Sequence, residues 1–105
     1  MFGEPEDLGP VRVLLIGAAG CSLVKYFIAH YPEGRMDVVE LHREMIEAAR
    51  MYFYLGELEE NLQVAHMDRL RIYISDGMKY LDRFVAQGKQ PRYDMIINDA
   101  YIGDH

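Results

Sequence analysis

The amino-acid sequence predicts an α/β fold, with helices on both faces of a parallel sheet of about four strands. Two observations lead to this prediction. Short runs rich in Val, Ile and Leu alternate along the chain with segments whose apolar residues recur at helical spacing. Strands that alternate with single helices are joined by right-handed crossovers, which align the strands in parallel. The chain has 105 residues, so we expect a single domain over residues 1–105.

The first elements are predicted from apolar runs and from the residues that bound them. Residues 1–10 are largely polar, with two prolines and two glycines, and we expect a short N-terminal arm there. Val11–Ile16 is a branched apolar run, which is typical of a strand buried on both faces. A helix is expected over Ser22–Tyr31, with Ser22 as its N-cap and Pro32 at its end.

The rest of the chain continues the alternation. Met36–Leu41 is predicted as the second strand, and Glu44–Leu55 as a helix that ends at Gly56. Residues 57–69 allow a short acidic helix. Some apolar residues of the second helix are expected in the core or on a partner surface: Met45, Met51, Tyr52 and Tyr54. The last predicted elements are a strand, a helix and a strand: Leu70–Ser75, Gly77–Ala86 and Tyr93–Asn98.

Composition excludes several classes of function. The 11 Lys and Arg against 17 Asp and Glu give a net charge of −6, which argues against nucleic-acid binding through the phosphate backbone. No apolar run approaches the ~18–20 residues that a membrane span needs, and the acidic start resembles neither a signal nor a transit peptide. Cys21 is the single cysteine, and no histidine lies near it at the spacing of metal ligands. We therefore expect a cytoplasmic protein without a metal.

The predicted topology brings a glycine turn and three acidic residues to one rim of the sheet. Open α/β sheets bind ligands at the carboxyl ends of their strands. In this sequence a glycine turn or an acidic residue lies at the end of every predicted strand: Gly17–Ser22, Glu40, Asp76 with Gly77, and Asp99. This rim is the candidate site.

The residues of the rim favour a nucleoside over a diphosphate. Gly17 and Gly20 frame a turn that lets backbone approach a ligand, and Glu40, roughly 20 residues on, suits a ribose diol. Ala18 and Ala19 narrow the space that a diphosphate would need, and the chain has no Gly-Lys-Ser/Thr motif. A structural turn at the two glycines and an ordinary surface acid at Glu40 are the alternatives.

These residues resemble the four successive motifs of spermidine synthase-like proteins, which have the class I S-adenosylmethionine-dependent methyltransferase fold. The resemblance covers about residues 11–99. It implies a truncated Rossmann-like version of that fold, with strand order 3-2-1-4 and only the cofactor-binding half. The motifs are four segments: Val13–Leu23, Asp37–Leu41, Ile74–Leu81 and Tyr93–Asp99.

The resemblance also implies roles for single residues. The Gly17–Ser22 loop would pass under the tail and sulfur of the donor, and Glu40, followed by Leu41, would hold the ribose. Asp76 would accept from the adenine amine, with the Gly77 backbone nearby. Asp99 matches the acid that helps to deprotonate the attacking amine. The full expected cofactor-binding set is Gly17, Ala18, Ala19, Gly20, Cys21, Ser22, Glu40, Leu41, Asp76, Gly77 and Asp99.

The chain departs from the family pattern in several places, among them Ala18 and Ala19, where the family usually has more glycine. His42 stands where the family usually has Asp, and no proline follows Asp99. The function expected from the resemblance is aminopropyl or methyl transfer from decarboxylated or intact S-adenosylmethionine, with a polyamine as a candidate acceptor. The alternative is an inactive nucleoside-binding or oligomerisation module, a fragment of a longer transferase. A homodimer is expected because an apolar fourth strand would lie uncovered at the sheet edge.

Overall fold

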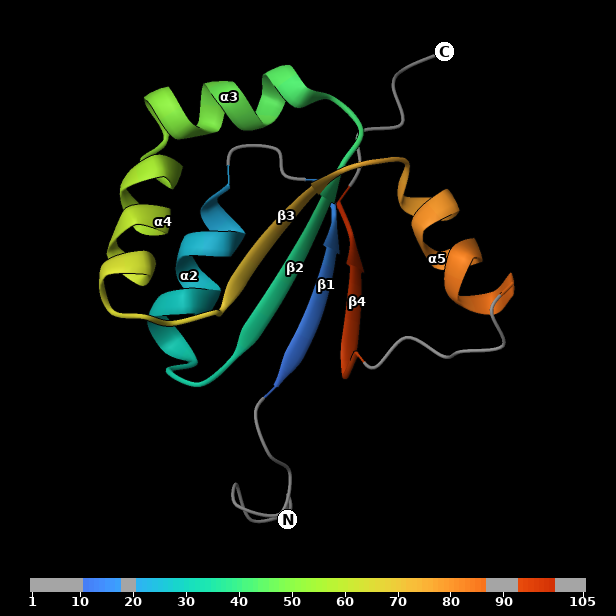
Figure 1. Cartoon of the computed structure of the whole chain (residues 1–105), viewed down its shortest axis with the longest axis horizontal. Coiled ribbons are helices and arrows are strands. Elements are labelled where there is room, and N and C mark those ends of the chain that lie inside the picture. Colours follow the sequence, from blue (N-terminus) through green and yellow to red (C-terminus); the bar gives the residue numbers. More distant parts are fainter. Residues whose placement is uncertain (1–10, 18–20, 87–92, 100–105) are drawn as a thin grey trace.

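In the computed structural model the sheet has the predicted topology. The structure describes residues 11–17, 21–86 and 93–99. All pairings are parallel and the strand order is β3-β2-β1-β4, as predicted (Figure 1). The elements are β1 (Arg12–Ile16), α2 (Ser22–His30), β2 (Arg35–Glu40), α3 (Arg43–Tyr52), α4 (Leu55–Val64), β3 (Leu70–Ile74), α5 (Gly77–Ala86) and β4 (Met95–Asn98). The predicted arm over residues 1–10 lies outside the described residues.

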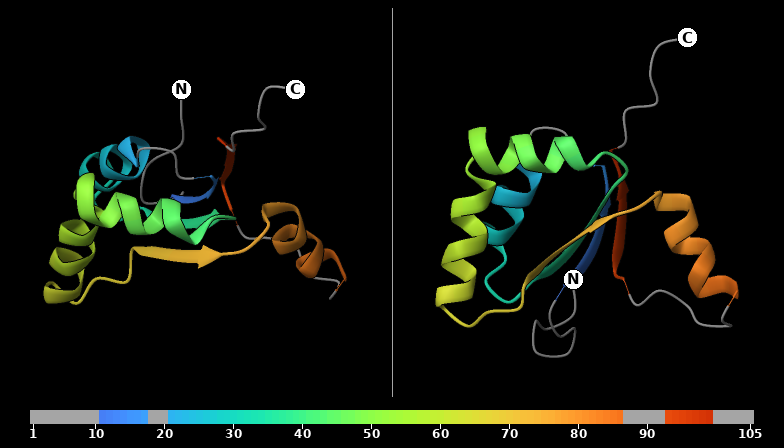
Figure 2. Two further views of the ribbon diagram at one scale, coloured as in Figure 1. Left: turned by 90° about the horizontal axis from the view of Figure 1, so that it is seen from above. Right: turned by 45° about the horizontal axis from the view of Figure 1, so that its top comes forward.

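The helices form two outer layers around the sheet. Seen from above, α2, α3 and α4 lie on one side of the sheet and α5 on the other (Figure 2). Successive side chains along a strand point to opposite faces of the sheet, so each strand packs against both helical layers. Val13 and Leu15 belong to the main core cluster with α2, α3 and α4, whereas the buried Leu14 of the same strand points to the other face. This arrangement confirms the predicted three-layer α/β/α fold.

The junction of α3 and α4 differs from the prediction. The expected helix over Glu44–Leu55 ends at Tyr52, and Gly56 lies inside α4 instead of ending a helix. The break is caused by Tyr54, which takes a left-handed conformation with φ 63°. This turn carries Leu55 into the core as the first residue of α4. The acidic segment after it, which the sequence left open, is therefore helical.

One further expectation about helices was wrong. Ser22 is the first residue of α2, and the N-cap position belongs to Cys21, which has a left-handed backbone and no side-chain capping bond. A normal N-cap has an extended backbone and a side-chain oxygen that accepts from the first turn, and Cys21 has neither. On α3 the buried residues are Ile46 and Ala49. Met45, Met51, Tyr52 and Tyr54 are exposed, as is Phe53, so they do not lie in the core, and the expected alternative of a partner surface stays open.

Arg69 ties the end of α2 to the start of β3. Its guanidinium donates to the carbonyl oxygens of Gly34 at 3.0 Å, Ile28 at 3.1 Å and Tyr31. The last carbonyls of a helix lack partners inside the helix, and a cation there also interacts favourably with the helix dipole. One side chain thus satisfies several carbonyls around the C-terminus of α2.

A hydrogen-bonded chain of side chains anchors α5 to the sheet. The Tyr93 hydroxyl donates to Asp37 Oδ2 at 2.6 Å, and the Tyr80 and Tyr93 hydroxyls lie 3.0 Å apart. Burial raises the pKa of Tyr93 far above its usual range, and its hydrogen bond to Asp37 raises it further. The raised pKa and the hydrogen bond to Asp37 therefore both favour the neutral form of the Tyr93 phenol. The network joins β2, α5 and the start of β4.

Candidate functional site

Backbone hydrogen bonds hold the carboxyl ends of the four strands at one rim. The Gly17 N–H donates to the Val39 carbonyl at 2.8 Å, which joins β1 to β2. The Ser75 N–H donates to the Glu40 carbonyl at 2.9 Å, and the Asp99 N–H donates to the Ile16 carbonyl at 2.7 Å. These bonds place Glu40, Asp99 and the start of α5 along one edge, at the tips of the strand arrows (Figure 1). The predicted rim is therefore present.

Gly17 is required by the backbone at the end of β1. Its φ is 88°, a conformation that L-residues with a side chain rarely adopt, and the residue is buried. This glycine lies beside Val39 of the neighbouring strand, to whose carbonyl its N–H donates. Three predicted site residues follow Gly17 and lie outside the described residues: Ala18, Ala19 and Gly20. Beyond them, Ser22 is exposed.

Glu40 is a buried acid with a fixed side chain. It is 7% exposed, and its Oε2 accepts a hydrogen bond from the His42 N–H at 2.8 Å. An ordinary surface acid at a strand end would be exposed and would not need this backbone donor. The His42 ring itself is exposed, with Nδ1 3.5 Å from Glu44 Oε1. The geometry therefore favours the interpretation of Glu40 as a site residue.

Asp76 has a structural role in addition to its place at the rim. Its Oδ1 accepts from the backbone N–H groups of Met78 at 2.8 Å and Lys79 at 3.4 Å, so it caps α5. Gly77 begins the helix where there is no room for a side chain. A Cβ at this position would lie 2.6 Å from Ile16 Cγ2. Packing against β1 thus fixes the start of α5, and with it Asp76.

Exposed apolar side chains surround the two acids. Leu41 follows Glu40 directly, and Ile74 is the β3 residue paired with Glu40 in the sheet register. Met78 lies in the first turn of α5, beside Asp76. All three are exposed although they are apolar. A flat apolar ligand group such as a purine would find contacts on this part of the rim.

Cys21 is held neutral by its surroundings. Burial raises the pKa of its thiol, and the negative charges of Glu40 and Glu59 raise it further. A helix N-terminus alone would lower the pKa of a thiol, and here that effect is outweighed. Cys21 is a small packing residue below the turn, and its buried, neutral thiol is poorly suited to nucleophilic chemistry.

Asp99 lies one residue beyond β4 and is exposed. Its position at the rim depends on its backbone bond to β1.

In the described part of the chain, no group of three or more His, Cys, Asp and Glu residues could hold a metal ion. No helix among these residues is long and apolar enough to cross a membrane.

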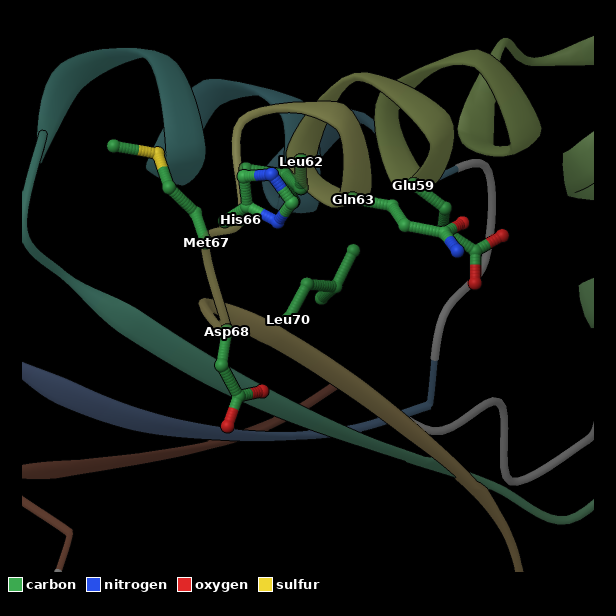
Figure 3. A pocket seen from close by; sticks show the side chains of 7 residues that line it. All are labelled: Glu59, Leu62, Gln63, His66, Met67, Asp68 and Leu70. Atoms are coloured by element: carbon green, nitrogen blue, oxygen red, sulfur yellow. The ribbon is translucent and has the colours of Figure 1, made fainter.

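An open hollow of about 510 Å³ lies far from the rim, between the end of α4 and the start of β3 (Figure 3). The sequence does not predict this hollow, because its walls come from two elements joined by an irregular segment. Both acids at the hollow already have cationic partners, Glu59 with Arg50 and Asp68 with Arg71. The lining residues are Glu59, Leu62, Gln63, His66, Met67, Asp68 and Leu70.

The fold and the rim define a class of protein. A parallel sheet in the order 3-2-1-4, a glycine turn after β1 and a buried acid ending β2 are the features of a nucleoside-binding α/β domain. The spermine/spermidine synthase domain model matches residues 4–102. The chain belongs to this family, and the family resemblance of the sequence motifs is confirmed.

Relatives of two kinds share this domain. The mouse eEF1A lysine and N-terminal methyltransferase is 30% identical over 102 residues, which is 95% of this chain and 13% of the relative. The polyamine aminopropyltransferase of Vibrio vulnificus is 32% identical over 96 residues, covering 91% of this chain and 28% of the relative. This chain thus spans only an eighth to just over a quarter of these relatives.

Solved structures show the same fold. Human methyltransferase-like protein 13, crystallised in complex with SAH, superposes with a TM-score of 0.75 at 28% identity, covering 91% of this chain and 40% of that chain. Spermidine synthase from Thermotoga maritima superposes with a TM-score of 0.61 at 26% identity, covering 87% and 28%. The chain therefore has the class I methyltransferase fold, over part of its usual length.

Proposed function

We propose that this chain is the donor-binding part of a transferase and that it binds S-adenosylmethionine or its decarboxylated form at the carboxyl rim. The observation that carries the proposal is the buried Glu40, oriented by the His42 N–H and next to the turn at Gly17. Further support comes from a structural neighbour crystallised with SAH and from polyamine aminopropyltransferases among the relatives.

Each part of the rim has a role in this proposal. The Glu40 carboxylate accepts from both ribose hydroxyls, each as a charge-assisted hydrogen bond. The adenine lies against Leu41 and Met78, and its amine donates to Asp76. One Asp76 oxygen caps α5, and a carboxylate has acceptor capacity for a second donor. From the family resemblance, Gly17 and Ser22 would lie near the sulfur and the tail of the donor.

The transfer itself is a displacement at a carbon attached to the donor's sulfonium. An amine nitrogen of the acceptor forms the new N–C bond, the C–S bond breaks, and its electron pair neutralises the sulfur. Asp99 takes the proton that the amine must lose, and its charge stabilises the cationic amine. Methyl and aminopropyl transfer share this chemistry, and we propose an amine acceptor, with polyamine biosynthesis as the corresponding process.

The role of Glu40 predicts a loss of donor affinity in a Glu40→Gln variant. The amide keeps the shape of the side chain but loses the charge that strengthens both bonds to the ribose. We expect methylthioadenosine to bind about tenfold more weakly, or about 1.4 kcal/mol. Isothermal titration calorimetry with methylthioadenosine, S-adenosylmethionine and decarboxylated S-adenosylmethionine measures this loss and ranks the donors.

The matched control is Glu33→Gln, which removes the same charge from an exposed turn before β2, at the opposite end of the sheet. This variant should bind like the unmodified chain. Equal affinity of the Glu40→Gln variant, with its thermal unfolding unchanged, would remove the ribose assignment. Absence of binding by the unmodified chain would remove the proposed function.

A transfer assay with putrescine and each donor separates the transferase from its alternative, an inactive binding module. Product formation that disappears in Asp99→Asn, with donor affinity retained, supports the transferase. Donor binding by a folded chain that forms no product supports the binding module. Since the single cysteine fits a reducing compartment, we propose a cytoplasmic location for either form.

The β4 edge of the sheet favours association of the chain with a second copy of itself. Met95 and Ile96 of β4 are both exposed, and β4 pairs with β1 alone among the described strands. We propose a homodimer through this edge, because uncovered strand edges pair with other strands. Sedimentation equilibrium should give a dimer that Ile96→Lys dissociates. A monomer at micromolar concentration would contradict it.

A further inference from the structure

The corner between α3 and α4 exposes four consecutive apolar side chains. They form what we call the corner patch: Met51, Tyr52, Phe53 and Tyr54, each between 48% and 73% exposed. Single exposed apolar residues are common on protein surfaces, whereas a contiguous group of large ones marks an interaction site. The patch lies where α3 ends and α4 begins (Figure 1). It belongs to neither the rim nor the main core.

The fold does not require an aromatic residue at Tyr54. The backbone there is left-handed, with φ 63°, and this conformation is costly for a bulky side chain. The turn serves to bring Leu55, which is buried, into the core. Glycine or asparagine would make the same turn with less strain. Residues that break a local rule without a gain in packing are typical of functional surfaces.

Charges around the corner patch favour a cationic partner. The Lys25 Nζ lies 5.0 Å from the centre of the Tyr54 ring, so this ring already accepts a cation on its face. Arg50 is neutralised by two hydrogen bonds to Glu59, at 2.7 Å and 3.0 Å. The exposed acids next to the patch are Glu47, one helical turn before Met51, and Glu57 and Glu60 on α4. The surplus charge at the corner is therefore negative.

We propose that the corner patch docks a basic segment of a partner polypeptide, one in which lysine or arginine alternates with apolar residues. Cationic side chains would lie over the Tyr52 ring and near Glu57, and apolar side chains against Met51, Phe53 and the Tyr54 ring. This function goes beyond donor binding. The ten residues of α3 separate the patch from Glu40 by roughly 15 Å along the helix.

The test uses fluorescence anisotropy with the full chain and labelled 12-residue peptides. The probe alternates lysine and leucine, and two comparison peptides alternate lysine with serine and glutamate with leucine. We expect the lysine–leucine peptide to bind most tightly, and less tightly as salt is raised. Tyr54→Asn should weaken it at least tenfold while keeping the fold, because asparagine accepts the left-handed backbone. Glu57→Lys should weaken it severalfold.

Two control variants carry similar changes outside the patch. Val64→Ser removes an exposed apolar side chain near the end of α4, and Asp82→Lys reverses an exposed charge on α5, across the sheet. Both should bind the peptide like the unmodified chain, and thermal unfolding should show that every variant is folded. The proposal is overturned if patch variants bind equally well, or if the lysine–serine or the glutamate–leucine peptide binds as tightly. It is also overturned if Tyr54→Asn dissociates a dimer of this chain, since the occupant is then a second copy.

Discussion

Replacing Arg69 by methionine is expected to lower the free energy of unfolding by about 2–4 kcal/mol. The guanidinium donates to three carbonyls at and after the end of α2, and hydrogen bonds from a charged donor contribute roughly 1.5–3 kcal/mol each. Two of these bonds are partly buried, so water replaces only part of what is lost. Methionine is shorter than arginine, but it replaces most of the apolar stem of the side chain and removes the donors. Urea unfolding followed by circular dichroism measures the change.

The neighbouring Arg71→Met variant is the matched control. Arg71 pairs with Asp68 three residues earlier, and both side chains are more than half exposed. An exposed pair of this kind contributes little, so we expect a change within about 0.5 kcal/mol. Lysine at position 69 should recover part of the loss, because an ammonium donates but cannot reach three carbonyls in a fixed fork. Equal stability of the methionine and arginine forms would show that α2 needs no such cap.

The strands and the rim were predictable from the sequence because both depend on short-range patterns. A short run rich in branched apolar residues and ended by glycine, such as Val11–Ile16, indicates a strand from local sequence alone. Once strands alternate with helices, the parallel topology alone brings residues far apart in the chain, such as Glu40 and Asp99, to one edge. The position of a site in this fold thus follows from the order of its elements.

Features that depend on packing between distant parts of the chain were not predictable. The sequence has no signal for the bond from Tyr93 to Asp37, which are 56 residues apart and meet only in the finished sheet. Similarly, glycine is typical of a helix end, which predicts that the helix ends at Gly56. The helix ends earlier, because burial of Leu55 forces Tyr54 into a left-handed turn. Local preference was overruled there by tertiary packing.

The same conflict between local preference and packing makes Gly77 the most informative glycine of the rim. Helix propensity alone predicts that a larger residue at the start of α5 stabilises the protein, by up to about 1 kcal/mol for alanine. The structure predicts the opposite sign, because a Cβ would lie 2.6 Å from Ile16 Cγ2, within the sheet. Asp76 precedes this glycine and caps the helix, so displacement of α5 moves a proposed adenine contact as well.

We therefore expect Gly77→Val to lower the free energy of unfolding by about 2–3 kcal/mol, in the range for overpacked sites, and to weaken methylthioadenosine binding in the folded protein. Ile16→Ala removes the methyl groups that the new side chain would meet. In that background, Gly77→Val should cost at least about 1 kcal/mol less, a coupling that a double-mutant cycle of urea unfolding measures. Additive losses would mean that the two residues do not compete for space. A more stable Gly77→Val protein would mean that α5 moves freely away from β1, and that Asp76 is not held in place by the core.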